Sequence, residues 1–115
     1  MPPEADTIRL RHMLDAAREA VRYAAGHTRV DLDGDRMRAL AIVKAIEIVG
    51  EAATKVSAAT RAQLGSVAWP EIAAMRNRLI HAYFDVDLDI VWNTVEVDLP
   101  PLIAELEAWL SREQT

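Results

Sequence analysis

The chain has 115 residues and no cysteine, with 51% apolar residues, 27% charged residues and a formal net charge of −5. This length fits one domain around a single modest core. The absence of thiols excludes disulfide scaffolds, thiol catalysis and cysteine–metal centres. An acidic chain is also poorly suited to tight nonspecific binding of nucleic acid, which depends on phosphate neutralisation by Lys and Arg. Any nucleic-acid site must therefore be a local basic patch.

The sequence contains no membrane or secretion signal that we can identify. No apolar run approaches the roughly 20 residues that a membrane-spanning helix needs. The first residues have neither the basic nor the apolar segment of a secretory signal. We therefore expect a cytoplasmic protein with no membrane partner. Residues 1–115 are expected to form one domain, with a core over about 6–110 and a frayed tail over 111–115.

The first predicted helix extends to about Ala24. Its apolar residues recur at steps of three and four from Leu10 onward, which is the spacing of one helical face. Asp6 or Thr7 is suited to cap its beginning, because both side chains can accept hydrogen bonds from free backbone N–H groups. Gly26 is suited to end it, because glycine adopts the left-handed conformation common after helices.

The second predicted helix runs from about Asp35 to Val56. It is apolar on more than half of its circumference, so we expect it to be central in the fold. Gly50 in its interior costs roughly 1 kcal/mol relative to alanine. The expected reason for this glycine is the close approach of a neighbouring helix.

The loop before this helix carries three aspartates around Gly34 and superficially resembles a calcium loop. An EF-hand loop needs glycine at its sixth position and glutamate at its twelfth. Counted from Asp31, glycine is fourth and Ile42 is twelfth. The sequence therefore favours a loop that caps helices, and we expect no metal site.

The second half of the chain predicts two more long helices. Residues 57–69 form a looser segment with a short turn of helix. A third helix is expected from Pro70 to Phe84, because proline suits the first helical turn. Asp87 is expected to cap a fourth helix, which should kink or break near Pro100 and Pro101. The fold predicted is an all-α, up-and-down bundle of four or five helices.

The third predicted helix carries the most informative cluster of polar residues. At about 100° per residue, Asn77 and His81 share one face with Arg78 beside them. Arg76 and Tyr83 project from the apolar side. An arginine on an apolar side can extend its head to the edge, pair with a carboxylate, or line a cleft between subunits. In the last case, a symmetric dimer would gather positive charge in one groove of an acidic protein.

These side chains are sufficient for cleaving RNA. Histidine has an unperturbed pKa near 6.5 and can exchange protons at physiological pH. Arginine can hold a phosphate and stabilise charge that develops on phosphorus. RNA supplies its own nucleophile, the 2′-OH, so neither a metal nor a cofactor is required. The alternative is that these residues make salt bridges or lie on the surface, since a spacing of this kind also occurs by chance.

The segment from Arg76 to His81 resembles the R-x-x-x-x-H signature of HEPN domains, and its flanks resemble the HepT-like members of that group. The matching segments are Ile48-Val49-Gly50-Glu51-Ala52-Ala53, Trp69-Pro70-Glu71-Ile72 with Met75, Tyr83-Phe84-Asp85-Val86-Asp87, Val91-Trp92 and Asp98-Leu99-Pro100. The resemblance covers roughly residues 8–110.

This resemblance implies an all-α homodimer whose motif lines the cleft between subunits. It implies a metal-independent endoribonuclease that acts as the toxin of a type II or type VII-like toxin–antitoxin pair. The implied antitoxin is a minimal, MNT-type nucleotidyltransferase that can add AMP to the toxin. By carry-over, Arg76 and His81 are catalytic, Asn77 is a supporting polar residue and Arg78 is a candidate RNA contact. Tyr83 is the implied AMPylation site.

Three questions stay open at this stage. The chain could instead be a noncatalytic HEPN module that binds a nucleotide or a nucleotidyltransferase and is regulated through Tyr83. Glu47 and Glu51 either pair within their own helix, or one of them pairs with Arg76 and orients it. The three tryptophans are expected in the core rather than as stacking platforms for bases.

Overall fold

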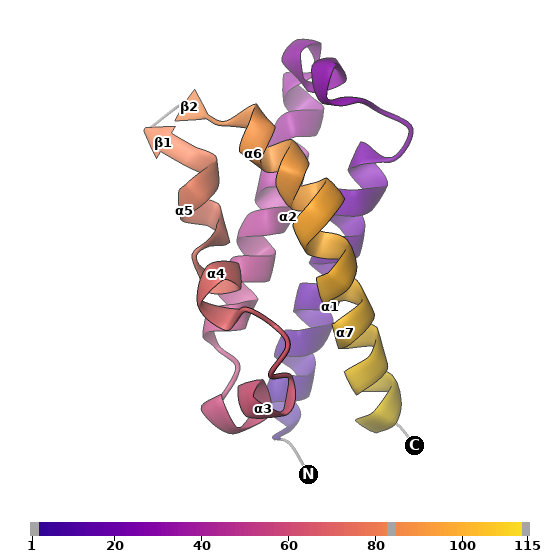
Figure 1. Ribbon diagram of the computed structural model, residues 1–115, viewed down its shortest axis with the longest axis vertical. Helices are drawn as coiled ribbons and strands as arrows, with labels where there is room; N and C mark the ends of the chain where they lie inside the picture. Colours follow the sequence, from indigo (N-terminus) through magenta and orange to yellow (C-terminus); the bar gives the residue numbers. More distant parts are fainter. Residues whose placement is uncertain (1–2, 83–84, 114–115) are drawn as a thin grey trace.

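A computed structural model describes residues 3–82 and 85–113 of the chain (Figure 1). The helices run up and down the long axis of a molecule of 46 × 28 × 20 Å. The elements are α1 (Glu4–Ala24), η1 (Arg29–Gly34), α2 (Arg36–Thr54), α3 (Ala58–Gln63), α4 (Trp69–Ala73), α5 (Met75–Leu79), β1 (Ile80–Ala82), β2 (Asp85–Val86), α6 (Leu88–Asn93), η2 (Thr94–Asp98) and α7 (Leu99–Glu113). The predicted all-α, up-and-down bundle is confirmed, with a small β1–β2 hairpin added to it.

The ends of α1 only partly match the prediction. The helix begins at Glu4 after Pro3 and has no side-chain cap, so the predicted capping by Asp6 or Thr7 is wrong. Asp6 is instead buried, with 4% of its surface exposed, and its carboxylate accepts hydrogen bonds from Ser57 and Thr60. Gly26 follows the last turn with φ +79°, which confirms its role as the helix terminator.

The acidic loop before α2 caps helices, as predicted. Asp31 accepts from the backbone N–H of Thr28 at the start of the 3₁₀ helix η1. Asp35 is the N-cap of α2 and accepts from the backbone N–H of Arg38 at 3.0 Å. This hydrogen bond, with the nearby Arg38 guanidinium, lowers the pKa of Asp35 below its ordinary value. Among the described residues, no group of three His, Asp or Glu side chains is arranged to hold a metal ion.

Gly50 lies where the backbone of α4 closely approaches α2. A Cβ atom at this position would lie 3.3 Å from the backbone carbonyl oxygens of both Ile72 and Ala73. This is tighter than an ordinary van der Waals contact. The prediction that a neighbouring helix explains the glycine is therefore confirmed.

The third predicted helix is not continuous. Pro70 lies in the first turn of α4, as expected, but the helix is interrupted at Ala74 and α5 ends at Leu79. The backbone then forms β1, which pairs antiparallel with β2. The carbonyl of Leu79 accepts a hydrogen bond from the backbone N–H of Asp87 at 2.7 Å. The predicted helix is therefore wrong beyond Leu79, because the backbone of residues 80–82 pairs with β2 instead of continuing the helix; Phe84 itself lies outside the described residues.

The two prolines of the last helix are accommodated by a π-helical segment. The backbone N–H of Leu99 donates to the carbonyl of Thr94, five residues earlier, at the end of η2. A proline has no N–H and its ring clashes with the carbonyl four residues earlier, so the wider π turn removes the conflict at Pro100 and Pro101. The helical path stays unbroken from Leu88 through Glu113, so residues 111–113 of the expected tail are helical.

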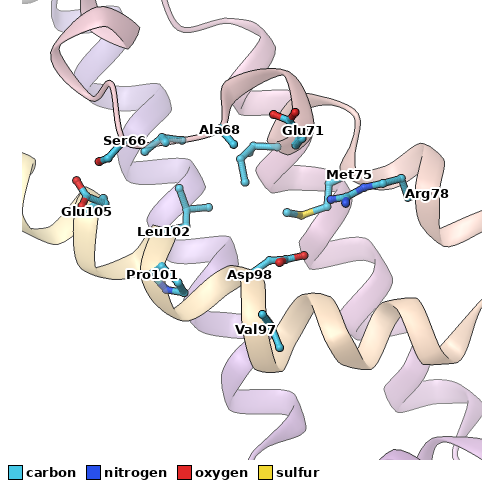
Figure 2. A pocket seen from close by; sticks show the side chains of 12 residues that line it. Ser66, Ala68, Glu71, Met75, Arg78, Val97, Asp98, Pro101, Leu102 and Glu105 are labelled. Atoms are coloured by element: carbon cyan, nitrogen blue, oxygen red, sulfur yellow. The ribbon is translucent and has the colours of Figure 1, made fainter.

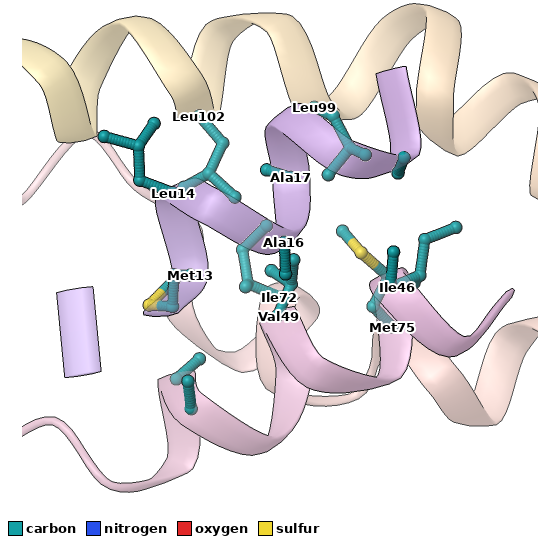
Figure 3. Packing of buried hydrophobic residues seen from close by; sticks show 14 of the residues in the cluster. Met13, Leu14, Ala16, Ala17, Ile46, Val49, Ile72, Met75, Leu99 and Leu102 are labelled. Carbon is teal, nitrogen blue, oxygen red and sulfur yellow. The ribbon is translucent and has the colours of Figure 1, made fainter. Parts of the chain in front are cut away.

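The core lies between α1, α2, α4, α5 and α7 (Figure 3). Trp69 and Trp109 are buried there, and Trp92 packs against the core with part of its ring exposed. The indole N–H of Trp69 donates to the carbonyls of Arg61 and Leu64, and that of Trp109 donates to Gln63. The prediction that the tryptophans belong to the core is confirmed. Within the described ranges, no helix has the length and apolar composition needed to cross a bilayer.

Candidate functional site

Helix α5 displays the charged motif because its two apolar residues anchor it in the core. Met75 and Leu79 are four residues apart, so they share one face of the helix. Both have no exposed surface. The residues between them, Arg76, Asn77 and Arg78, are all exposed. The apolar pair therefore sets the rotation of α5 and directs the polar residues outward.

Arg76 forms an ion pair with Glu47 of α2. The Nε of Arg76 donates to the Oε1 of Glu47 at 3.1 Å. The Arg76 side chain is 55% exposed, whereas that of Glu47 is 26% exposed. Of the three arrangements that the sequence allowed for Arg76, pairing with a carboxylate is the one observed. Lys44 lies on the other side of Glu47, with its Nζ 4.0 Å from Oε2.

The geometry of this ion pair leaves most of the Arg76 guanidinium available. Only Nε contacts Glu47, and no hydrogen bond joins the two terminal nitrogens to another residue in the described part of the chain. These terminal nitrogens carry four of the five guanidinium N–H donors. A planar guanidinium that is held at Nε can still offer a paired set of donors to a phosphate.

Glu51 has a different role from Glu47. Its carboxylate lies 3.6 Å from the Nζ of Lys55, four residues later on the same helix, and its side chain is 73% exposed. This is the intrahelical pairing that the sequence allowed for either glutamate. The sequence allowed either Glu47 or Glu51 as the partner of Arg76 and gave no reason to prefer one of them. The spacing of acidic residues along α2 was the same for both interpretations, so the choice between them needed the packing of α2 against α5.

An apolar face of α2 adjoins the ion pair. Leu40 lies seven residues before Glu47, and therefore on nearly the same side of the helix. Leu40 is 43% exposed, Met37 is 83% exposed and Ile48 is 38% exposed. We call Met37, Leu40 and Ile48 the α2 stripe. The sequence predicted that α2 is apolar on more than half of its circumference, but these residues do not enter the core.

Arg76 and Arg78 lie on opposite sides of α5. They are two residues apart, which is about 200° around a helix. Arg76 faces α2 through Glu47, whereas Arg78 lines a groove that α4 and α5 form with η2 and α7 (Figure 2). Within one subunit, the two arginines therefore belong to different surfaces, as their positions around the predicted helix indicated.

His81 and Tyr83 lie beyond the end of α5. The backbone of His81 belongs to β1, and its side chain lies outside what the structure describes. The predicted helical step from Asn77 to His81 is wrong, because the chain leaves the helix after Leu79. Tyr83 lies outside the described residues. Asp87 is at the N-terminus of α6 and accepts from the backbone N–H of Ile90, as predicted for a cap.

Comparison with known proteins identifies one family. The family described as "Ribonuclease HepT-like" matches residues 13–109. A Thermococcus cleftensis protein provisionally named ribonuclease HepT is 38% identical over 64% of this chain and 66% of its own length. A provisionally named RNase of Caldanaerobacter subterraneus is 32% identical over 91% of this chain and 94% of its own length. Another from Methanocaldococcus jannaschii is 30% identical over 83% of this chain and 87% of its own length.

No solved structure matches the chain significantly.

Proposed function

Because the chain belongs to the HepT-like ribonuclease family, we propose that it is an endoribonuclease that cleaves RNA without a metal ion, using Arg76 and His81. The observation that carries this proposal is the geometry of Arg76: Glu47 accepts a hydrogen bond from its Nε, while the side chain stays 55% exposed. The relatives named as RNases support the same reaction class.

The reaction needs a base, an acid and a group that stabilises charge on phosphorus. In our proposal, the 2′-OH of RNA loses its proton to a general base and attacks the adjacent phosphorus. The P–O5′ bond breaks, and the leaving 5′-oxygen receives a proton. His81 exchanges these protons, since an imidazole titrates near neutral pH. The product is a 2′,3′-cyclic phosphate, or the monophosphate that forms when water opens it.

Arg76 stabilises the charge that develops on the phosphoryl oxygens. Donors that are already oriented towards such charge lower the barrier without reorganising during the reaction. Glu47 supplies this orientation, because its bond to Nε fixes the plane of the guanidinium. Asn77 is proposed as a supporting donor. The expected RNA contact of Arg78 is not part of this proposal, because Arg78 lines an acidic groove on the side of α5 opposite to Arg76. Both Asn77 and Arg78 are exposed on α5.

We further propose that two subunits pair through the α2 stripe. The exposed apolar side chains of Met37, Leu40 and Ile48 gain free energy when a second copy covers them. Glu47 and Arg76 adjoin this stripe, so a symmetric pair would bring two copies of Arg76 towards one cleft. Such a cleft would concentrate positive charge even though each subunit carries a formal charge of −5.

The biological role that we propose is that of a toxin in a toxin–antitoxin pair. The partner would be a nucleotidyltransferase that silences the ribonuclease by adding AMP to Tyr83. Tyr83 lies two residues after His81 in the sequence. An anionic nucleotide attached there would repel the RNA phosphate and occupy space beside the catalytic histidine.

The alternative is a noncatalytic module that binds a nucleotide or a nucleotidyltransferase. The formal charge of −5 favours it, because an acidic surface repels RNA at long range. An enzyme and a binding module differ in what they require of His81 and Arg76. A nuclease depends on both side chains, whereas a module regulated through Tyr83 does not.

RNA cleavage by the purified protein in the presence of a metal chelator distinguishes the ribonuclease from the binding module. Wild type, Arg76→Ala and His81→Ala are incubated with total RNA after matched folding is checked by circular dichroism. We expect cleavage by the wild type alone, with cyclic phosphate ends on the products. Absence of cleavage by all three proteins, with Tyr83 shown to be unmodified by intact mass, would favour the binding module.

A further inference from the structure

A groove lies on the side of α5 opposite to Arg76. It runs between α4 and α5 on one wall and η2 and α7 on the other, and it encloses a cavity of about 380 Å³ (Figure 2). The base of the groove is apolar, because the side chains of Ile72, Met75 and Leu102 close it. All three belong to the core, with at most 7% of their surface exposed. Core packing therefore fixes the side chains at the base of the groove.

The charges around the groove are mainly negative. Glu71 lies on one wall, and Asp98 and Glu105 lie on the other (Figure 2). None of these three carboxylates forms an ion pair with another residue in the described part of the chain. Arg78 is the one cation among the lining residues. Three carboxylates against one guanidinium disfavour RNA as the occupant, since phosphate would be repelled.

The length of the groove suits a short helix. Val97, Pro101 and Glu105 line it at steps of four along the last helical segment. At 1.5 Å per residue, the eight helical steps from Val97 to Glu105 cover about 12 Å. This length accommodates about two turns of a second helix. Val97 is 56% exposed, so the rim also offers apolar surface that nothing in the described chain covers.

We propose that this groove docks a basic amphipathic helix of a partner protein. The exposed apolar surface of Ala68, Val97 and Pro101 would receive the apolar face of the helix. Flanking lysines or arginines of the helix would meet Glu71, Asp98 and Glu105. This is the usual way in which a groove between helices recognises a peptide. A small polyamine would satisfy the carboxylates but would leave this apolar surface uncovered.

The position of the groove links such a partner to the candidate active site. Met75 and Arg78 line the groove, while Arg76 lies between them in the sequence and faces the opposite side of α5. A helix in the groove would therefore press on the same short element that carries Arg76. The docking itself does not depend on ribonuclease activity and can be tested without RNA.

The test uses a fluorescein-labelled peptide of about 14 residues, with leucines on one helical face and lysines beside them. A matched peptide carries glutamates in place of the lysines. Binding to the full chain is measured by fluorescence anisotropy at physiological salt. We expect the lysine peptide to bind at least about tenfold more tightly than the glutamate peptide, because the rim repels the latter.

Two variants then change the lining of the groove: one removes its carboxylates and the other replaces an exposed apolar side chain. The triple variant Glu71→Gln, Asp98→Asn, Glu105→Gln should weaken binding of the lysine peptide by about tenfold, if each rim pair contributes a few tenths to 1 kcal/mol. Val97→Lys should weaken it at least as much, because it places a cation on the rim. Circular dichroism confirms that the variants are folded.

The matched control removes three carboxylates elsewhere. Glu4→Gln, Asp15→Asn and Glu113→Gln lower the negative charge by the same amount, and none of these exposed residues lines the groove. Binding that survives this control but not the groove variants supports the proposal. Equal weakening by both triple variants, equal binding of the two peptides, or no binding of either peptide would overturn it.

Discussion

Glu47 engages only one of the five N–H donors of the Arg76 guanidinium. The contact fixes the plane of the guanidinium and leaves both terminal nitrogens open to a phosphate. An unpaired arginine with 55% of its side chain exposed would instead sample many rotamers. Glu47 therefore serves mainly to orient the Arg76 guanidinium, since an ion pair that is exposed to water adds little to the stability of the fold.

Replacement of Glu47 is expected to reduce RNA cleavage. Glu47→Ala should lower kcat/KM by roughly 10- to 100-fold, which corresponds to about 1.4–2.7 kcal/mol of transition-state stabilisation. Glu47→Gln should lose less, because its amide oxygen can still accept from Nε. Initial rates on a defined RNA measure both effects.

The matched control for Glu47 is Glu51→Gln. Glu51 lies on the same helix and pairs only with Lys55 among the described residues, so its neutralisation should leave kcat/KM unchanged. If Glu47→Ala cleaves RNA as fast as Glu51→Gln does, Glu47 does not position Arg76.

At the scale of elements, the ends of α5 decide where the motif lies. The helix starts after the interruption at Ala74 and stops at Leu79, where the backbone bonds to Asp87. Both limits follow from packing and long-range pairing. The position of α4 is in turn set by its close contact with Gly50, so this glycine helps to place α5 against α2.

We expect Gly50→Ala to lower the free energy of unfolding, although alanine is the better helix former. The propensity gain is about 1 kcal/mol. Crowding against the carbonyl oxygens of Ile72 and Ala73 at 3.3 Å should cost about 1–3 kcal/mol, because backbone must move. The net loss is therefore expected to be up to about 2 kcal/mol. Urea unfolding measures it.

Gly34→Ala provides the comparison for Gly50→Ala. A Cβ atom at Gly34 would meet nothing within 4 Å, and its φ is not in the left-handed region. This substitution should be neutral, or stabilising by about 0.4–1 kcal/mol. A Gly50→Ala variant that gains as much stability as Gly34→Ala would show that α4 shifts freely.

At the scale of the whole molecule, Asp6 connects the first helix to the beginning of α3, more than 50 residues later. Burial by itself would raise the pKa of Asp6. The hydrogen bonds from the side chains of Ser57 and Thr60, and from the backbone N–H of Ser57, outweigh burial and lower that pKa below its ordinary value. Since the folded state binds its proton more weakly than the unfolded state, Asp6 stabilises the fold above the unfolded pKa of about 3.9. This stabilisation is lost as the pH falls through the lowered pKa.

Asp6→Asn is expected to destabilise the protein by about 1–3 kcal/mol at pH 7, because the asparagine cannot satisfy all three donors as a carboxylate does. The difference from wild type should shrink as the pH falls below the unfolded pKa of about 3.9, because the unfolded wild-type carboxylate then binds a proton more readily than the folded one. Urea unfolding at several pH values measures both. Asp15→Asn, at an exposed position of the same helix, should show neither effect. A pH-independent difference would contradict the assignment.

The proposed dimer predicts that Leu40 is needed for two subunits to associate. Leu40→Asp on the α2 stripe should convert a dimer into a monomer, because a carboxylate would be buried without a partner. Analytical ultracentrifugation measures the mass in solution. Ile8→Asp is the matched control, since Ile8 is 44% exposed and Leu40 is 43% exposed, but Ile8 lies on α1. A dimer that survives Leu40→Asp would place the interface elsewhere, and a monomeric wild type would refute the pairing.

The sequence by itself determined the features that depend on local order. Helical periodicity predicted the all-α bundle and the buried face of α1. Local capping chemistry predicted the roles of Gly26, Asp35 and Asp87. The helix-breaking property of proline predicted the irregularity before Pro100. The R-x-x-x-x-H motif gave the family, because the motif and its flanks are contiguous in the chain.

Only the tertiary structure decided what depends on residues far apart in sequence. Periodicity cannot reveal that the carbonyl of Leu79 bonds to Asp87, so it extended the third helix too far. It could not choose between Glu47 and Glu51, because the partner, Arg76, lies on another helix. Local sequence predicts a cap at Asp6 because its actual partners, Ser57 and Thr60, lie more than 50 residues away. The acidic groove likewise exists only because α4 and α5 pack beside η2 and α7.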